Sequence, residues 1–457
     1  MLAAIDAVAR EATLFAALWF LVGGIDDLLV DLIYGARRLR GWLQPPPAPP
    51  SLEDAPPSGR IAIFVPAWDE SAVIGDMLRA TLARYDHGDY RIYVGTYPND
   101  PATVAAVGRV AGADRRVRLV IGEAPGPNTK ADCLNVLWRA LCRDEAAEGV
   151  AAVAVALHDA EDVVHPLELR VFAQWLVHYS AVQLPVLPLP HPRSRFVSGH
   201  YLDEFAEAHA KQLVVRQALR AGMPLAGVGC AIRRDMLGRI AAARSGNPFD
   251  ASSLTEDYEL GLTIAAMGGE TALVRVPEGP GGRPVAVRAF FPATLDAAVR
   301  QKARWLTGIA LAGWDRTGWG RLGHWRDHWM RMRDRRATLA MPVLAVAYAA
   351  LVAWGLSLGV HFVAGSAPPT SPLVGGLLWA NIALLGWRFA ARALFVWRSY
   401  GGREAWWSAP RMFVGNFIAL LAARRALTLY VEMLAGAPPR WDKTDHQFPA
   451  DVARATA

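Results

Sequence analysis

The sequence predicts an α/β fold, in which a mostly parallel β-sheet carries helices on both faces and is joined to transmembrane and interfacial helices. From residue 61 onward, short β-type runs alternate with helical ones, which is typical of a parallel sheet. Of the 457 residues, 53% are hydrophobic, and the mean hydropathy is +0.18, which is high for a soluble protein. Polar clusters also follow the predicted strands directly.

The predicted elements of the sheet run in a regular order. We expect strands at 61–67, 90–97, 116–122 and 150–159, and helices at 70–84, 101–111 and 129–142. Asp69 and Glu70 follow the first strand, Asn99 and Asp100 follow the second, and an acidic run follows the fourth. Because ligands of such sheets bind beyond the carboxyl ends of the strands, we expect these side chains to border one site.

Three segments are long and apolar enough to cross a membrane as helices, namely 12–34, 338–364 and 373–396. Arginines follow the first segment and precede the second, and such flanks are typical of the cytoplasmic side. They are Arg37, Arg38, Arg40, Arg331, Arg333, Arg335 and Arg336. We therefore expect a bacterial inner-membrane protein with the α/β domain in the cytoplasm. These flanks account for the net charge of +6, and no basic stripe on a soluble face indicates nucleic acid.

Charged residues inside apolar segments refine this topology. Asp26 and Asp27 would each cost about 2.5–3.5 kcal/mol in lipid, so we expect them to pair with arginine or a backbone donor. Arg424 and Arg425 stand in the middle of an apolar helix at 410–434, which favours an interfacial helix over a membrane span.

Composition divides the chain into five predicted units. These are an N-terminal transmembrane helix at 1–43, a Pro-rich linker at 44–59, the cytoplasmic α/β domain at 60–325, transmembrane helices at 326–400, and an interfacial helix with a cytoplasmic C-terminal segment at 401–457. The stretch "WDKTDHQF" in the last unit is expected to end near the active site.

The acidic run "HDAED" places Asp159, Glu161 and Asp162 at the end of a buried strand. Like charges this close repel, so a cation would make the arrangement tolerable. Oxygen ligands suit Mg²⁺ or Mn²⁺, and Mg²⁺ is commonly held by one or two carboxylates together with substrate phosphates. A solvated acidic turn that caps the next helix explains the same residues equally well.

Two later motifs point to the same chemistry, and each also has an ordinary structural explanation. "SLTEDYEL" holds Glu256 and Asp257 at a helix start, where capping alone could account for them. In "RQKARWLTG", Gln301, Arg304 and Trp305 share one helical face. Arginine binds phosphate oxygens and tryptophan offers a flat face to a sugar ring, but a basic amphipathic helix on a membrane surface would look similar.

In order and separation, "DAED", "TED" and "QKARW" resemble the DxD, TED and QxxRW motifs of family 2 glycosyltransferases, which are inverting enzymes with a GT-A fold. Within this family, the sequence more closely resembles the inner-membrane glycosyltransferases of the bacteriophage adsorption protein B type. "VPAWDE", "GTYPNDPAT", "KADCLN" and "YLDEFAEAHAKQLVVR" extend this likeness, which is dense over about 60–320. It implies a nucleotide-sugar-binding GT-A domain.

The resemblance also implies roles for individual residues. Asp257 would be the general base, Asp159 and Glu161 would hold Mg²⁺ or Mn²⁺, and the substrate-binding residues would be Glu70, Asp100, Lys130, Asp162, Glu256, Gln301, Arg304 and Trp305. Two departures stand out. The usual Asp-Asp pair after the second strand is "TYPND", with only Asp100 nearby, and the second acid of DxD is Glu161.

The function expected from these observations is transfer of a sugar from a nucleotide-sugar, expected to be a UDP-sugar, to a growing glycan or lipid-linked acceptor in envelope or exopolysaccharide synthesis. A hexosyl or N-acetylhexosaminyl transferase is expected. Three membrane segments are few for a translocation pore, so we expect export to involve an export or outer-membrane partner protein. A non-catalytic envelope-complex scaffold and a single-sugar transferase to polyprenyl phosphate remain as alternatives.

Overall fold

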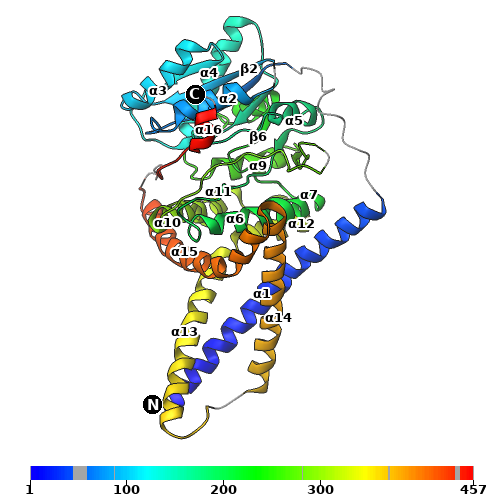
Figure 1. The fold of residues 1–457 in the computed structure, drawn as a ribbon, viewed down its shortest axis with the longest axis vertical. Helices are drawn as coiled ribbons and strands as arrows, with labels where there is room; N and C mark the ends of the chain where they lie inside the picture. The colour runs from blue at the N-terminus through cyan, green and yellow to red at the C-terminus, as the bar shows by residue number, and fades with distance from the viewer. Residues whose placement is uncertain are drawn as a thin grey trace.

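The computed structural model describes residues 2–44, 59–86, 88–279, 281–368, 371–437 and 443–455. An α/β body carries three long helices that project from one of its ends (Figure 1). The body contains a seven-stranded sheet in the order β3-β2-β1-β4-β6-β5-β7. Most of the predicted linker at 44–59 lies outside the described residues.

The strands are β1 (Ile61–Pro66), β2 (Tyr90–Thr96), β3 (Val117–Ile121), β4 (Ala154–Leu157), β5 (Ala181–Gln183), β6 (Cys230–Arg233) and β7 (Thr271–Leu273). The helices of the body are α2 (Ile74–Arg84), α3 (Pro101–Ala113), α4 (Lys130–Glu148), α5 (Glu168–Trp175), α6 (Gly199–Glu207), α7 (Leu213–Ala218), α8 (Arg234–Ala243), α9 (Glu256–Ala266), α10 (Leu295–Leu306), α11 (Ala312–Thr317), α12 (Trp325–Arg335) and α16 (Ala450–Ala455). Two π-helical turns, η1 (Ala208–Gln212) and η2 (Thr307–Leu311), follow α6 and α10. The remaining helices are α1 (Leu2–Leu43), α13 (Ala337–Val363), α14 (Pro372–Tyr400) and α15 (Gly402–Leu434).

The sheet is mostly parallel, as the sequence predicts. β1 pairs in parallel with β2 and β4, β2 pairs in parallel with β3, and β5 pairs in parallel with β7. Only β6, which is antiparallel to β4 and β5, runs the other way. The carboxyl ends of β1, β2 and β4 therefore meet at one edge, where the predicted polar clusters lie.

Helices cover both faces of the sheet because the side chains of each strand alternate between two cores. Ile61 and Ile63 of β1 pack with α2, α3 and α5, whereas Ala62 and Phe64 pack with α4, α8 and α9. Every residue of β1 is buried, as expected for a strand covered on both sides.

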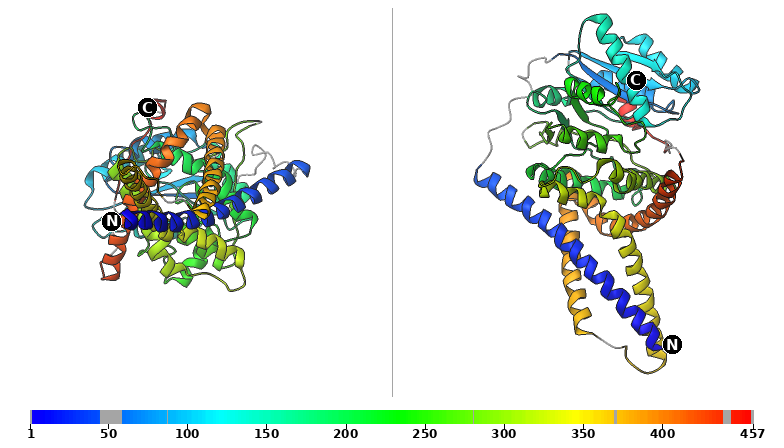
Figure 2. Two further views of the ribbon diagram at one scale, coloured as in Figure 1. Left: turned by 90° about the horizontal axis from the view of Figure 1, so that it is seen from below. Right: turned by 180° about the vertical axis from the view of Figure 1, so that it is seen from behind.

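Three helices in the described part of the chain are long and apolar enough to span a membrane: α1, α13 and α14. They lie side by side below the body in both side views (Figures 1 and 2). The first helix is longer than its apolar segment, because no proline interrupts residues 2–43. Gly24 lets α14 approach α1 closely, since an added Cβ would lie 2.8 Å from a Leu384 side-chain carbon.

The acidic pair of α1 is neutralised, as predicted. Asp27 Oδ1 lies 2.9 Å from Arg333 and 2.8 Å from Arg336, and its other oxygen lies 2.6 Å from Arg388. Asp26 pairs with Arg333 and Arg336 as well. Because the arginines come from α12, α14 and the start of α13, these ion pairs tie the spans to the body.

A second buried ion pair fixes α15 to the body. Arg411 is 1% exposed, and its guanidinium lies 3.2 Å from Asp203 on α6 and also pairs with Glu404. Burial raises the pKa of Asp203 to about 7, with Arg411 opposing the shift. Gly199 permits the contact, because a Cβ there would lie 2.5 Å from the Arg411 guanidinium.

Replacing Arg411 with Leu should therefore destabilise the protein by about 3–5 kcal/mol, because the buried carboxyl of Asp203 would lose its ion-pair partner and would have to take up a proton or stay buried as a charge. Thermal unfolding in detergent at a fixed scan rate measures the loss. The double variant Asp203→Asn/Arg411→Leu should recover part of it. Arg79→Leu, which removes an exposed pair with Asp76, is the control and should change stability by no more than about 0.5 kcal/mol.

Candidate active site

A cleft of about 1000 Å³, including its open mouth, lies beyond the carboxyl ends of the strands. All of the predicted site residues except Glu70 and Asp100 line it, together with aromatic and C-terminal residues. The lining includes Lys130, Asp159, Glu161, Asp162, Thr255, Glu256, Asp257, Gln301, Arg304, Trp305, Phe205, Phe290, Phe291, Asp445 and His446.

Lys130 joins the two acidic motifs. It stands at the first position of α4, and its Nζ lies 2.5 Å from Asp159 and 3.9 Å from Glu256. Burial alone would lower the pKa of Lys130, but the carboxylates of Asp159, Glu256 and Asp257 raise it overall. The lysine is therefore held as a cation in the cleft, where it can meet a diphosphate.

His158 holds the acidic run after β4 in place from the side away from the cleft. This fully buried side chain contacts Asp162 at 2.9 Å and Glu168 at 2.6 Å. Burial alone would lower the pKa of His158, but the carboxylates of Glu168 and Asp162 raise it to about 10. Asp162 also accepts the Asp159 backbone N–H at 3.0 Å. Asp162 thus fixes the turn, and Asp159 and Glu161 face the cleft.

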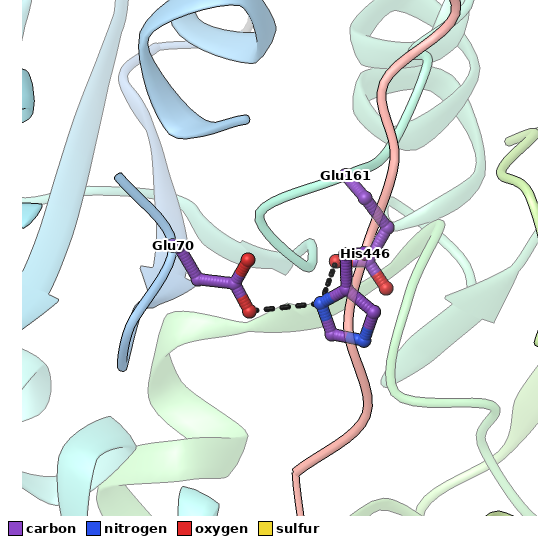
Figure 3. A group of neighbouring side chains, drawn as sticks. All are labelled: Glu70, Glu161 and His446. Carbon is purple, nitrogen blue, oxygen red and sulfur yellow. Dashed lines mark hydrogen bonds and ion pairs between the residues drawn. The ribbon is translucent and has the colours of Figure 1, made fainter. Parts of the chain in front are cut away.

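The C-terminal residues 443–448, here called the C-terminal strap, cross the cleft beside Glu161. His446 Nδ1 lies 2.8 Å from Glu70 and 3.2 Å from Glu161 (Figure 3). Lys443 contacts Glu70 at 3.3 Å, and Phe448 packs against the core of the sheet. α16, which follows the strap, packs on α2. The strap therefore joins the loop after β1 to the acidic run after β4.

Asp257 stands in the first turn of α9 and faces the cleft. Its Oδ1 accepts the Tyr258 backbone N–H at 2.8 Å, whereas the N-cap residue Thr255 caps nothing with its side chain. Gly227 makes room for the carboxylate: its φ is +73°, and an added Cβ would lie 2.6 Å from Asp257 Oδ2. Burial raises the pKa of Asp257, with Lys130 opposing the shift, so the group is a stronger base than an ordinary aspartate.

α10 closes the other side of the cleft with Gln301, Arg304 and Trp305. Gln301 Oε1, Arg304 Nε and Thr255 Oγ1 are buried atoms that have no hydrogen-bond partner among the described residues. A buried polar atom without a partner costs about 1–3 kcal/mol. All three atoms belong to residues that line the cleft.

Aromatic rings form the wall next to α10. Phe205 and Phe291 have ring centroids 4.8 Å apart, and Phe205 lies 6.2 Å from Trp305. Flat apolar faces beside polar groups suit a pyranose ring, which presents C–H groups on one face and hydroxyls at its edge.

Two predicted substrate-binding residues lie outside the cleft lining. Glu70 is next to it, in contact with His446. Asp100 is instead bonded to the backbone: it caps α3 through the Thr103 N–H at 3.2 Å and accepts the Asp69 N–H at 2.6 Å. Both of its oxygens are therefore engaged in holding the loop after β1.

Reasoning from the sequence gave no role to His446, Phe205 or Phe291. His446 lies more than 270 residues from the acidic run, and its neighbours carry no motif that marks a partner. Phe205 and Phe291 look like ordinary core residues in an apolar pattern. The only available signal for His446 was the unusually polar "WDKTDHQF" after an apolar helix.

The mostly parallel sheet, with helices on both faces and an acid-lined cleft at its carboxyl edge, agrees with the GT-A fold class that the sequence predicts. The chain belongs to the family described as "Glycosyltransferase like family 2", whose model matches residues 56–308. The predicted family and fold class are thereby confirmed, and the membrane helices are found as expected by length and composition.

Two curated relatives are similar over most of the chain. Bacteriophage adsorption protein B of Escherichia coli (strain K12) and bacteriophage N4 adsorption protein B of Escherichia coli O157:H7 are each 35% identical over 463 residues. The alignment covers 94% of this chain but 61% of each relative, so the chain spans about three fifths of their length.

One solved structure shares the fold over nearly the whole chain. The mannosyltransferase PcManGT from Pyrobaculum calidifontis, in complex with GDP-Man and Mn²⁺, superimposes with a TM-score of 0.53 at 18% identity. The match covers 93% of this chain and 99% of that protein. It therefore includes membrane-side helices as well as the sheet.

Proposed function

We propose that this protein is a membrane-anchored inverting glycosyltransferase that uses a nucleotide-sugar, expected to be a UDP-sugar. The acceptor would be a growing glycan or a lipid-linked sugar, and the transferred group a hexosyl or N-acetylhexosaminyl unit. One observation carries the proposal: a single cleft brings together a buried carboxylate, an arginine and an acidic run, and leaves buried polar atoms there without protein partners.

In this proposal, Asp257 removes the proton of the acceptor hydroxyl. Inversion requires one base on the face of the sugar opposite the leaving group, and a carboxylate with a raised pKa is suited to that task. The acceptor oxygen then forms the new glycosidic bond to the anomeric carbon as its bond to the diphosphate breaks. Phe205, Phe291 and Trp305 would hold the acceptor ring beside the base.

The leaving nucleotide diphosphate gains negative charge as the bond breaks. Arg304 and Gln301 on α10 can donate hydrogen bonds to it, and Lys130 supplies a further cation from α4. Donors arranged before the reaction stabilise such charge best, because they need not reorient. Glu256 lies beside Lys130 and would keep that lysine in place.

The acidic residues of the cleft fit a divalent cation. Glu161 Oε2 is buried and lies 3.2 Å from His446 Nδ1, and possible ligand atoms of Glu70, Glu161 and His446 all lie within 4.8 Å of one another. Asp159 with Glu161 is the predicted pair, and His446 is a further candidate ligand. Mg²⁺ or Mn²⁺ held there would neutralise the donor diphosphate.

We further propose that the α/β body lies on the cytoplasmic side of a bacterial inner membrane. Support comes from the arginines that follow the apolar segment of α1 and precede α13. The curated relatives are longer than this chain, and an export or outer-membrane partner stays part of the proposal.

The direct test is turnover of nucleotide-sugars by the full chain in nanodiscs, with release of nucleotide diphosphate as the readout. Arg304→Lys should weaken binding of the product diphosphate about 10–100-fold, because one charge-assisted hydrogen bond of about 1.5–3 kcal/mol is lost. Arg300→Lys, on the same helix but outside the cleft lining, is the control and should bind normally.

The outcomes separate the alternatives. Failure of every donor to turn over would favour the scaffold function. Transfer of one sugar only, to polyprenyl phosphate, would favour the single-sugar transferase. Equal diphosphate binding by wild type and Arg304→Lys would remove Arg304 from the leaving-group site.

A further inference from the structure

We propose that Tyr258 and Asp334 are positioning residues for the general base: their hydrogen bond fixes the first turn of α9 and thereby the place of the Asp257 carboxylate. This inference rests on the proposed function, because it takes Asp257 as the base. It extends that function to two residues that lie outside the lining of the cleft. Asp334 belongs to α12, so the support of the base comes from a helix that also contacts the span α1.

The start of α9 is held by its neighbours rather than by its own cap. The N-cap residue Thr255 makes no side-chain hydrogen bond to the helix. Tyr258, next to Asp257 in the chain, is buried, and its hydroxyl donates to Asp334 Oδ2 at 2.8 Å. Successive residues of a helix point about 100° apart, so Tyr258 is anchored behind the turn while Asp257 faces the cleft. The hydrogen bond of Tyr258 therefore sets the rotation of the turn that carries the base.

Asp334 is itself held in one place. One guanidinium nitrogen of the buried Arg216, on α7, lies 2.7 Å from Asp334 Oδ1 and 2.9 Å from Oδ2. A carboxylate whose two oxygens are engaged by an arginine has little freedom to turn. Burial and the carboxylate of Asp334 raise the pKa of Tyr258, with Arg216 opposing the shift, so the hydroxyl keeps its proton and donates it. The hydroxyl of Tyr258 thus meets a fixed acceptor.

A second acid of α12 fixes the other neighbour of the base. Asp327 stands seven residues before Asp334, and therefore on the same face of the helix. Its Oδ1 accepts the Gly222 N–H at 2.8 Å. The segment that begins at Gly222 lies directly on α9, because a Cβ added to Gly261 would overlap a backbone oxygen of that segment. The same segment leads to Gly227, which leaves room for the carboxylate of the base. α12 therefore supports the base from two sides.

The opposite face of α12 is tied to the span α1. The indole N–H of Trp329 donates to Asp26 at 2.6 Å, and Arg333 lies 2.9 Å from Asp27. Trp329 and Arg333 are four residues apart, so they share a face of α12, and that face is not the one that carries Asp334. The acceptor for Tyr258 is thus fixed relative to the span as well as to the sheet.

Tyr258→Phe tests the hydrogen bond with little change in packing, because only the hydroxyl is lost. In the full chain in nanodiscs, with the donor that wild type turns over, kcat should fall about 10–100-fold, since a slightly misplaced base reacts much more slowly. KM for the donor and binding of the product diphosphate should stay as in wild type. Tyr430→Phe removes a similar hydrogen bond, to Asp315 at 2.7 Å outside the cleft lining, and should transfer normally.

Asp334 is tested with two substitutions that both remove its charge. Asp334→Asn keeps an oxygen that can accept the Tyr258 hydroxyl, whereas Asp334→Ala does not, so Asp334→Asn should retain the higher kcat. Melting temperatures are measured on the same preparations. Equal kcat in the two folded variants would exclude this hydrogen bond as the means of positioning. If Asp334→Ala does not fold, Tyr258→Phe decides alone.

The Asp257→Asn background separates positioning from general damage. There Tyr258→Phe should leave the residual transfer unchanged, because no base remains to be displaced. The same fold-loss in both backgrounds would indicate a general structural effect and overturn the inference. Transfer by Tyr258→Phe close to that of wild type, while Asp257→Asn has lost it, would overturn the inference alone. Transfer retained by Asp257→Asn, or no turnover by wild type, would overturn the proposed function and the inference with it.

Discussion

Asp257→Asn is expected to lower the rate of glycosyl transfer by about 10²–10⁴ while the protein remains folded and binds nucleotide normally. Asparagine keeps an oxygen that can accept the Tyr258 N–H, so the first turn of α9 stays satisfied. It cannot accept the acceptor's proton at neutral pH. Single-turnover transfer, melting temperature and nucleotide affinity should be measured on the same preparation.

Asp235 provides a matched control for this substitution. It also stands in the first turn of a helix, and its Oδ1 accepts the N–H of the next residue, Met236, at 2.8 Å. It lies outside the cleft lining. Asp235→Asn should therefore preserve transfer. If Asp257→Asn retains transfer within a few-fold of wild type, another group is the base.

The sequence predicts the first half of the sheet well because each strand there is a continuous apolar run. β1 to β4 all fall inside the predicted segments. β5 and β7 are only three residues each, Ala181–Gln183 and Thr271–Leu273, and such runs do not stand out from a loop. Their place in the sheet depends on long-range contacts, because β5 pairs with β6 and β7 pairs with β5.

The candidate site was predictable where residues are close in sequence or share a helix face, as with Asp159 and Glu161 or Gln301 and Arg304. It was not predictable where the site depends on distant parts of the chain. His446 contacts Glu70 because the C-terminal strap lies beside the loop after β1, where α16 packs on α2. Asp100 is a residue for which the sequence pattern suggested too much. Its position after a strand indicated ligand binding, but its oxygens accept backbone N–H groups.

The C-terminal strap also bears on how the acidic groups of the cleft are balanced. Lys130 lies against Asp159, and His446 lies against Glu161. Each acid that faces the cleft thus has a cationic or ionisable neighbour from another element. A divalent cation that binds these carboxylates must compete with Lys130 and His446. Substituting each acid separately tests which of them holds the metal.

Glu161→Gln and Asp159→Asn are each expected to abolish metal activation and to lower transfer by about 10²-fold or more. A divalent cation contributes several kcal/mol to stabilising the transition state, and about 1.4 kcal/mol corresponds to a factor of ten in rate. Both changes preserve side-chain size but remove a charged oxygen ligand. Direct binding of Mn²⁺, measured by calorimetry with and without nucleotide, gives a readout that does not depend on turnover.

Two further variants, His446→Gln and the control Glu278→Gln, distinguish a loss of metal binding from a general loss of stability. His446→Gln should weaken Mn²⁺ binding if His446 is a ligand, and should leave it unchanged if the histidine only neutralises Glu70 and Glu161. Glu278→Gln changes a similar glutamate–histidine pair, with His165 at 3.2 Å, outside the cleft lining and should bind Mn²⁺ normally. Wild-type transfer that persists in excess EDTA would exclude a required metal. Lys130 and His446 alone would then neutralise Asp159 and Glu161.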